Sequence, residues 1–363
     1  MRKHKFSAIT RPNKCFKMTK RLIFIFFPIV GLVFGVLSGW LRIGWDIPVY
    51  GLAGFHGVLM LGGFLGSLIC FEKAVAAKKS WAYIVPLFSG LSVFAFLLNQ
   101  ASVGYLLQIG ASFGLVLIYV VLVNSSKGYD IILPLIGAMC WLAGNVLLYQ
   151  TQFYPTVFPW WIAFILFTIV GERLELPFSY KHKRLLYVLL LITLVGFMLP
   201  YHGVGRTVTS AGMIAIALWL LRFDLVRTLL KKKGHYLYTG LSLTLGYVWL
   251  LVSAVFMIFV TSGAFALDAL LHSFFLGFAI SMIFAHGSII FPAFLHKSGQ
   301  HFHRILWLWL GVFQVSIAAR IIADLLTMPL LRKWAGMVNG IIILFFLVTM
   351  FVLVQKGRTL QSK

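Results

Sequence analysis

Residues 50–71 read YGLAGFHGVLMLGGFLGSLICF, an apolar run long enough to cross a bilayer as one helix. The run holds one ionisable residue, His56. An ionisable side chain at bilayer depth is costly, so it usually faces a partner, a cofactor or a cavity. The alternative is a histidine that is hydrogen-bonded to a neighbouring helix. Glycines in the same run allow a bulky group or another helix to come close: Gly57, Gly62, Gly63 and Gly66.

Hydrophobic residues make up 61% of the 363 residues and charged residues only 11%, which excludes an ordinary soluble domain. We therefore predict an all-α, polytopic transmembrane helix bundle of about 12 spans. A basic tail is expected at 1–20, the transmembrane domain at 21–355 and a second tail at 356–363. The expected spans are 21–43, 48–71, 81–99, 101–123, 131–149, 155–173, 184–201, 206–222, 236–261, 264–294, 304–326 and 334–355.

The formal net charge of +23 comes from basic residues in short connections between the apolar runs. Basic connections alternate with connections that carry almost no charge, and Arg332 and Lys333 are the exception. Because basic loops stay on the cytoplasmic side, we expect both termini to be cytoplasmic in an inner (plasma) membrane. The partner indicated is membrane lipid, not nucleic acid. Three cysteines without metal-like spacing predict neither a disulfide framework nor a zinc site: Cys15, Cys70 and Cys140.

The tenth expected span carries a second intramembrane histidine, His272. With both termini inside, His56 and His272 each lie about eight residues into a span that enters from the outer face. At 1.5 Å per residue, both lie roughly 12 Å below the outer surface. Two histidines at one depth on two helices are what bis-imidazole ligation of a heme requires. Two unrelated core histidines are the alternative.

The segment His56-Gly57-Val58-Leu59-Met60 resembles the second transmembrane helix of heme–copper oxidase subunit I. In that family an HG-x-x-M segment supplies one axial histidine to the low-spin heme, and span ten supplies the other. The resemblance implies heme b held by His56 and His272. The family's His-x-His of span ten and its copper-binding histidines of spans six and seven are absent here, so copper is unsupported. The span count and the span-ten histidines are also similar to those of the nitric-oxide-response NnrS proteins.

Other residues extend this predicted site. His286 follows His272 by fourteen residues on the same helical face, about 21 Å further along. We expect it to make a structural contact, with a metal or proton site as the alternative. Arg320 and Arg206 are candidates to bind heme propionates, because arginine binds carboxylates in a fork. For Arg320 the alternative is an ion pair with Asp324, four residues on.

Acidic residues near the inner ends of the spans predict an interfacial salt-bridge cluster, with a proton entry point as the alternative: Glu72, Glu172 and Glu175, beside Lys73 and Arg173. The favoured function is a b-type heme protein in electron transfer or nitric oxide response, with a redox protein or respiratory subunit as its partner. A transporter or channel without heme, a heme- or copper-dependent oxidoreductase, and an assembly factor that holds a cofactor in transit are the alternatives. Whether the protein turns over a substrate is left open.

Overall fold

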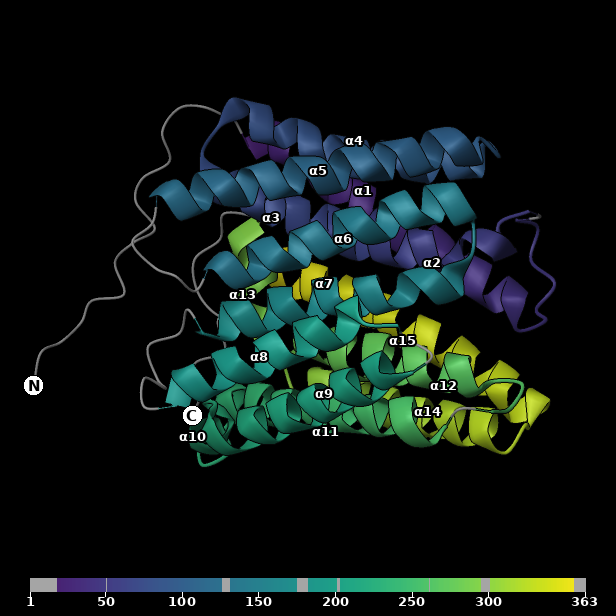
Figure 1. Cartoon of the computed structure of the whole chain (residues 1–363), viewed down its shortest axis with the longest axis vertical. Coiled ribbons are helices and arrows are strands. Elements are labelled where there is room, and N and C mark those ends of the chain that lie inside the picture. The colour runs from purple at the N-terminus through teal and green to yellow at the C-terminus, as the bar shows by residue number, and fades with distance from the viewer. Residues whose placement is uncertain are drawn as a thin grey trace, which may run out of the picture.

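The computed structural model describes residues 18–49, 51–125, 131–174, 182–200, 203–260, 262–294 and 301–355. Within these residues the fold is helical, without strands, and the long helices run side by side (Figure 1). The all-α prediction is therefore confirmed. Most of both predicted tails lies outside the described residues, as do Cys15 and Glu175.

Ten helices fill most of the bundle: α1 (Met18–Arg42), α4 (Ile84–Leu97), α5 (Ala101–Ser125), α6 (Ile132–Thr151), α7 (Tyr154–Leu174), α8 (Lys183–Met198), α9 (Val204–Phe223), α11 (His235–Phe259), α14 (Ile305–Leu325) and α15 (Pro329–Gln355). Span two consists of η1 (Ala53–Phe55), α2 (His56–Val58), η2 (Leu59–Gly66) and α3 (Ser67–Ala77). Span ten consists of α12 (Ala266–His272), η6 (Ser273–Ile280) and α13 (Ser281–Phe294). Two short helices adjoin longer ones: η3 (Ser80–Tyr83) leads directly into α4, and α10 (Val226–Leu229) follows α9.

Eleven helical segments in the described residues are long and apolar enough to cross a membrane. The remaining expected span, α8, has 16 residues and a length of about 24 Å at 1.5 Å per residue. The protein is thus a multi-pass helical membrane protein.

Two predicted boundaries are wrong. Span two continues to Ala77, so Glu72 and Lys73 lie within the helix and not after it. The last span begins at Pro329, so Arg332 and Lys333 lie near the start of α15 and not in the connection before it. Proline is well suited to the first position of a helix, because its missing N–H would have had no helical partner there.

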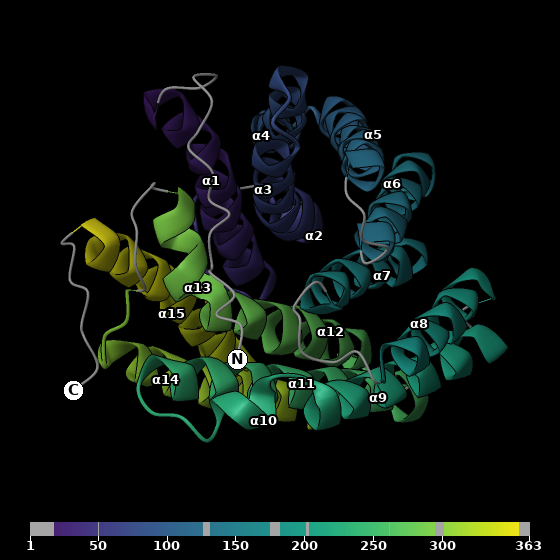
Figure 2. The ribbon, with the colours of Figure 1, turned by 90° about the vertical axis from the view of Figure 1, so that its left-hand side faces the viewer.

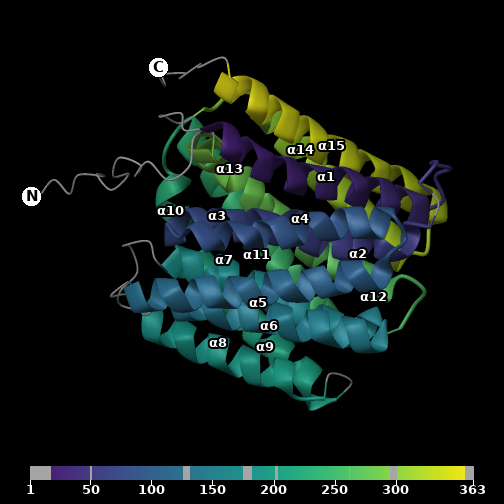
Figure 3. The same cartoon turned by 90° about the horizontal axis from the view of Figure 1, so that it is seen from above.

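The helices form two curved layers when the bundle is viewed nearly end-on (Figure 2). Helices α1 to α7 make one layer, the other contains α8 to α11, α14 and α15, and span ten lies between them. Helix α1 begins and α15 ends at the same end of the bundle, as Figure 3 shows. We call this the terminal end and the opposite end the site end.

Candidate functional site: a histidine pair at the site end

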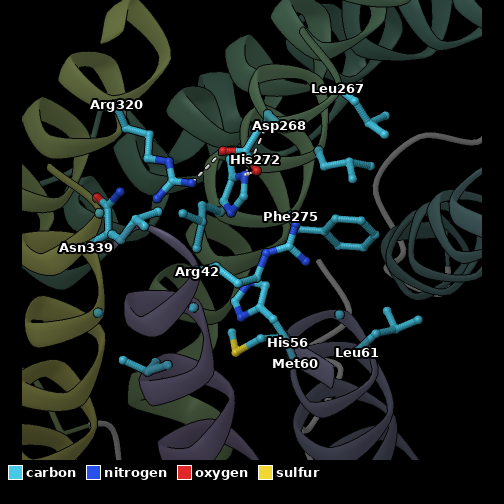
Figure 4. A pocket seen from close by; sticks show the side chains of 18 of the residues that line it. Arg42, His56, Met60, Leu61, Leu267, Asp268, His272, Phe275, Arg320 and Asn339 are labelled. Carbon is cyan, nitrogen blue, oxygen red and sulfur yellow. Dashed lines mark hydrogen bonds and ion pairs between the residues drawn. The ribbon is translucent and has the colours of Figure 1, made fainter. Parts of the chain in front are cut away.

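Two histidines from spans two and ten meet near the site end. His56 is the first residue of α2, and His272 is the last residue of α12. Their ring centres are 6.2 Å apart and their ring planes differ by 17°. Figure 4 shows the two rings facing one another across a pocket. The structure therefore brings together the two histidines that the sequence places at equal depth.

Each ring is held through its Nδ1 atom. His56 Nδ1–H donates to the carbonyl oxygen of Gly35 on α1 at 2.8 Å, and His272 Nδ1–H donates to the carbonyl oxygen of Asp268 at 2.8 Å. A carbonyl only accepts, so Nδ1 carries the proton and Nε2 of a neutral imidazole keeps its lone pair. Within the described chain neither Nε2 has a hydrogen-bond partner. Both Nε2 atoms can therefore bind a metal, with orientation fixed from behind.

The separation of the rings suits a shared metal. Two imidazoles that bind one metal from opposite sides, with metal–nitrogen bonds of about 2.0–2.1 Å, place their ring centres roughly 6 Å apart. The observed 6.2 Å agrees with this geometry. No group of three or more His, Cys, Asp or Glu side chains in the described chain is arranged to hold a metal ion.

The pocket beside the rings has a volume of about 610 Å³. Its walls come from α1, spans two and ten, α7, α14 and α15, and they are largely apolar and aromatic: Leu61, Phe158, Trp161, Phe275 and Ile343 are examples. A volume of about 300–1,000 Å³ with apolar walls and a few polar groups is typical of cofactor sites.

Glycines in the pocket lining leave room for the ring of His56 and for neighbouring aromatic side chains. A Cβ atom on Gly39 would lie 2.8 Å from Cε1 of His56, closer than packing allows. One on Gly57 would lie 3.0 Å from Cε1 of Tyr154, which also lines the pocket. Larger side chains at these positions would displace the pocket wall.

Three arginines also line the pocket: Arg42, Arg320 and Arg332. Arg320 is bound to Asp268 at 2.6 Å and lies 3.7 Å from Asp324, so the ion pair considered from the sequence is present. Arg42 has no carboxylate partner among the described residues. It therefore offers an unpaired cation to a ligand in the pocket.

Asp268, Arg320, Asp324 and Arg332 form an arginine–aspartate cluster beside His272. Figure 4 shows Asp268 and Arg320 of this cluster next to the His272 ring. Asp268 Oδ2 accepts from Arg320 Nη2 and Arg332 Nη2, both at 2.6 Å. Asp268 Oδ1 lies 3.2 Å from His272 Nδ1. Asp324 Oδ1 accepts from Arg332 Nε at 2.7 Å. The carboxylate nearest the histidine is thus fixed by two cations.

Sequence reasoning missed the role of Arg332. Its guanidinium also lies 4.2 Å from the ring centre of Phe265, in a cation–π contact. The sequence contains one signal for it: Arg332 is an exception to the pattern in which basic connections alternate with uncharged ones. A cation that breaks the topological pattern needs a local reason, and here the reason is the pair of aspartates.

The remaining predicted site residues lie elsewhere. Arg206, on α9, does not line the pocket, and neither do Gly63 and Gly66. Added Cβ atoms on these glycines would come within 2.7 Å of Val93 and 2.6 Å of Trp141, so they permit close packing against α4 and α6. His286 donates from Nδ1 to the Met282 carbonyl, and its Nε2 accepts from Arg173 Nη1 at 3.2 Å. It therefore makes a structural contact.

The terminal half of the bundle holds a second group of paired charges, which are partly to largely buried. Lys73 is 2.8 Å from Glu72 and 2.7 Å from Glu172. Arg173 binds the Asp224 carboxylate in a fork, and Tyr247 donates to the same carboxylate at 2.6 Å. These ion pairs join α3, α7 and the connection after α9, as a salt-bridge cluster requires.

In both spans that carry a histidine of the pair, the helix changes to wider, π-helical turns shortly after the histidine. The π-helical segment η2, Leu59–Gly66, begins three residues after His56, and η6, Ser273–Ile280, begins immediately after His272. Such wide turns are rare in proteins as a whole, and those that occur are frequently found at functional sites. Their presence on both spans sets these two helices apart from the regular helices α5, α6 and α11.

A family model described as "Domain of unknown function (DUF8744)" matches residues 21–355. The chain belongs to this family. The match includes both histidines, the arginine–aspartate cluster and every pocket-lining residue, so the whole candidate site lies inside the DUF8744 region. Neither a curated protein nor a solved structure matches the chain.

Proposed function

We propose that this DUF8744 protein is an integral membrane b-type heme protein in which His56 and His272 bind the two axial positions of one iron. The observation that carries the proposal is the histidine pair. Its ring centres are 6.2 Å apart, each Nδ1 is held by a backbone carbonyl, and both Nε2 atoms are available. A hydrogen bond from the outer ring nitrogen to a fixed acceptor is what orients metal-binding histidines.

The pocket suits the rest of a heme. The apolar and aromatic walls suit a flat, hydrophobic ring, and the cations at the site end suit its anionic propionates. Arg42 is the best placed of these cations, because it lines the pocket without a carboxylate partner in the described chain. Arg320 lines the pocket too, but its charge is shared with two aspartates. Arg206 lies away from the pocket and is not part of the proposal.

Heme bound in this way supplies one-electron redox chemistry. Because both His56 and His272 would be held by the iron, this arrangement would favour electron transfer over oxygen or nitric oxide turnover. The protein's own residues would hold the iron, exclude water and balance the propionate charges. A redox protein in or at the membrane is the partner that this function requires.

We expect protein purified in detergent from heme-replete cells to be red. It should carry about one heme per chain and show the visible spectrum of low-spin iron with two imidazole ligands. Heme and iron content, measured per chain, and the reduced-minus-oxidised spectrum check this. A colourless but monodisperse preparation from such cells would overturn the proposal.

For the orientation, we propose that the terminal end is cytoplasmic. Basic residues gather at that end, in connections and in the last turns of helices, including Lys78, Lys79, Arg222, Arg227 and Lys231. Retention of basic loops in the cytoplasm then places the histidine pair toward the outer face of the plasma membrane.

Labelling of single cysteines should report this orientation. In a background without the native cysteines, Asp46→Cys at the site end should react with an impermeant maleimide in intact cells, because Asp46 is exposed. Lys79→Cys, exposed at the terminal end, should react only after permeabilisation. The reverse pattern would contradict the proposed orientation.

A further inference from the structure

The two histidines of the pair differ in what their Nδ1–H groups face. His56 Nδ1–H meets the neutral carbonyl of Gly35 at 2.8 Å. His272 Nδ1–H meets the Asp268 carbonyl at 2.8 Å and, in addition, the Asp268 carboxylate at 3.2 Å. One imidazole is therefore backed by a neutral acceptor alone, and the other also by an anion.

The anion behind His272 is held in place. The Asp268 side chain is 19% exposed, and those of Arg320 and Arg332 are 7% and 15% exposed. Both arginines donate to the same oxygen, Oδ2, which leaves Oδ1 turned toward the imidazole. Charge-assisted bonds in a largely buried cluster are strong and directional, so the carboxylate keeps this position.

A carboxylate beside the outer N–H of a metal-binding histidine raises the basicity of that ligand. A more basic ligand stabilises the oxidised, more positive iron, and hydrogen bonds to the ligands are one of the protein's means of adjusting a heme potential. The two arginines oppose this effect, because they withdraw part of the carboxylate's charge. The sign of each side chain's influence therefore follows from the geometry.

We infer that Asp268 is a positioning residue that acts through His272 and lowers the redox potential of the iron bound by the histidine pair, while Arg320 and Arg332 limit how far it falls. This inference rests on the proposed heme function. It assigns the two axial ligands unequal roles: His56 holds the iron, and His272 also sets the potential.

The same cluster contains a matched control for charge. Asp324 is fully buried, and it contacts Arg332 at 2.7 Å and Arg320 at 3.7 Å. No hydrogen bond joins Asp324 to His272 in the described residues. Asp268→Asn and Asp324→Asn thus each remove one negative charge from one cluster, but only the first removes the carboxylate that faces the imidazole.

The test is a redox titration of the purified holoprotein, followed in the visible spectrum, with electron paramagnetic resonance of the oxidised form. Asp268→Asn should shift the midpoint potential to more positive values and change the g-values of the low-spin iron. Asp324→Asn should give a smaller shift with wild-type g-values. Arg332→Gln, which frees the carboxylate, should shift the potential in the negative direction.

Equal potential shifts in the two asparagine variants, with unchanged g-values in both, would overturn the inference, because Asp268 would then act only as a distant charge. If Asp268→Asn does not retain heme, Arg332→Gln decides through its g-values: a negative shift with changed g-values supports the inference, and a negative shift with wild-type g-values, or no shift, refutes it. Failure of the proposed function itself looks different, since wild-type protein would then contain no heme to titrate.

Discussion

Replacement of His56 or His272 by alanine is expected to lower the heme content of the purified protein by more than roughly tenfold. Mutation of even an outer-shell partner of a metal ligand typically costs 10–100-fold in affinity, and here an axial ligand itself is lost. Each single variant should have this effect, because the remaining imidazole alone leaves one axial position of the iron without a protein ligand. The measurement is heme per chain, from the visible spectrum and the protein concentration.

His286→Ala is the matched control for this experiment. His286 lies on span ten as His272 does, but it does not line the pocket and its Nε2 is bonded to Arg173. The control should retain heme and elute as a single species on size-exclusion chromatography. Normal heme content in both His56→Ala and His272→Ala would refute the assignment of these residues as ligands.

The second large effect is expected at the terminal half of the bundle. Arg173→Met should destabilise the folded protein by about 3–5 kcal/mol, the usual cost of breaking a buried ion pair from one side. Arg173 and Asp224 are each only 7% exposed, and three hydrogen bonds at 2.7–3.2 Å join them. The variant leaves the Asp224 carboxylate buried with Tyr247 as its only remaining hydrogen-bond donor in the described chain.

The double variant Arg173→Met with Asp224→Asn separates charge from packing. It removes both charges, so it should recover a large part of the stability lost in the single variant. Unfolding in detergent, followed by helical circular dichroism against a denaturant, gives the comparison. Wild-type stability in Arg173→Met would show that the pair contributes nothing to the fold, and equal loss in both variants would assign the effect to packing.

Apolar runs were sufficient to find the spans. A membrane-crossing helix needs about 20 consecutive apolar residues, and few other segments contain such a run. The same rule failed at Glu72 and Lys73. Charged residues normally mark the end of a span, but these two lie in the continuing helix, where Lys73 is paired with Glu72 and with Glu172 of α7. A run of sequence does not show which charges will be neutralised by another helix.

The candidate site was predictable in part for a related reason. Counting residues from the span boundary gave His56 and His272 a common depth, and depth needs only local information. The charge pattern marked Arg332 as an exception but did not show where it lies. The positions of Arg332, Arg42 and the Gly35 carbonyl at the pocket were not predictable, because these groups reach it from α1 and α15. These helices are joined by contacts such as the 3.2 Å hydrogen bond from Trp40 Nε1 to the Gly336 carbonyl, 296 residues apart.

The wide π-helical segments beyond the two histidines bear on how the chain tolerates changes in its length. Loss of one residue from a regular helix rotates everything beyond it by roughly 100°, since 3.6 residues complete a turn. Inside Leu59–Gly66 or Ser273–Ile280, a lost residue can instead convert a wide turn into a regular one and leave the helical phase of both flanks nearly intact. Deletion of a single residue from a membrane span is therefore least disruptive inside these two segments, which lie next to the histidines.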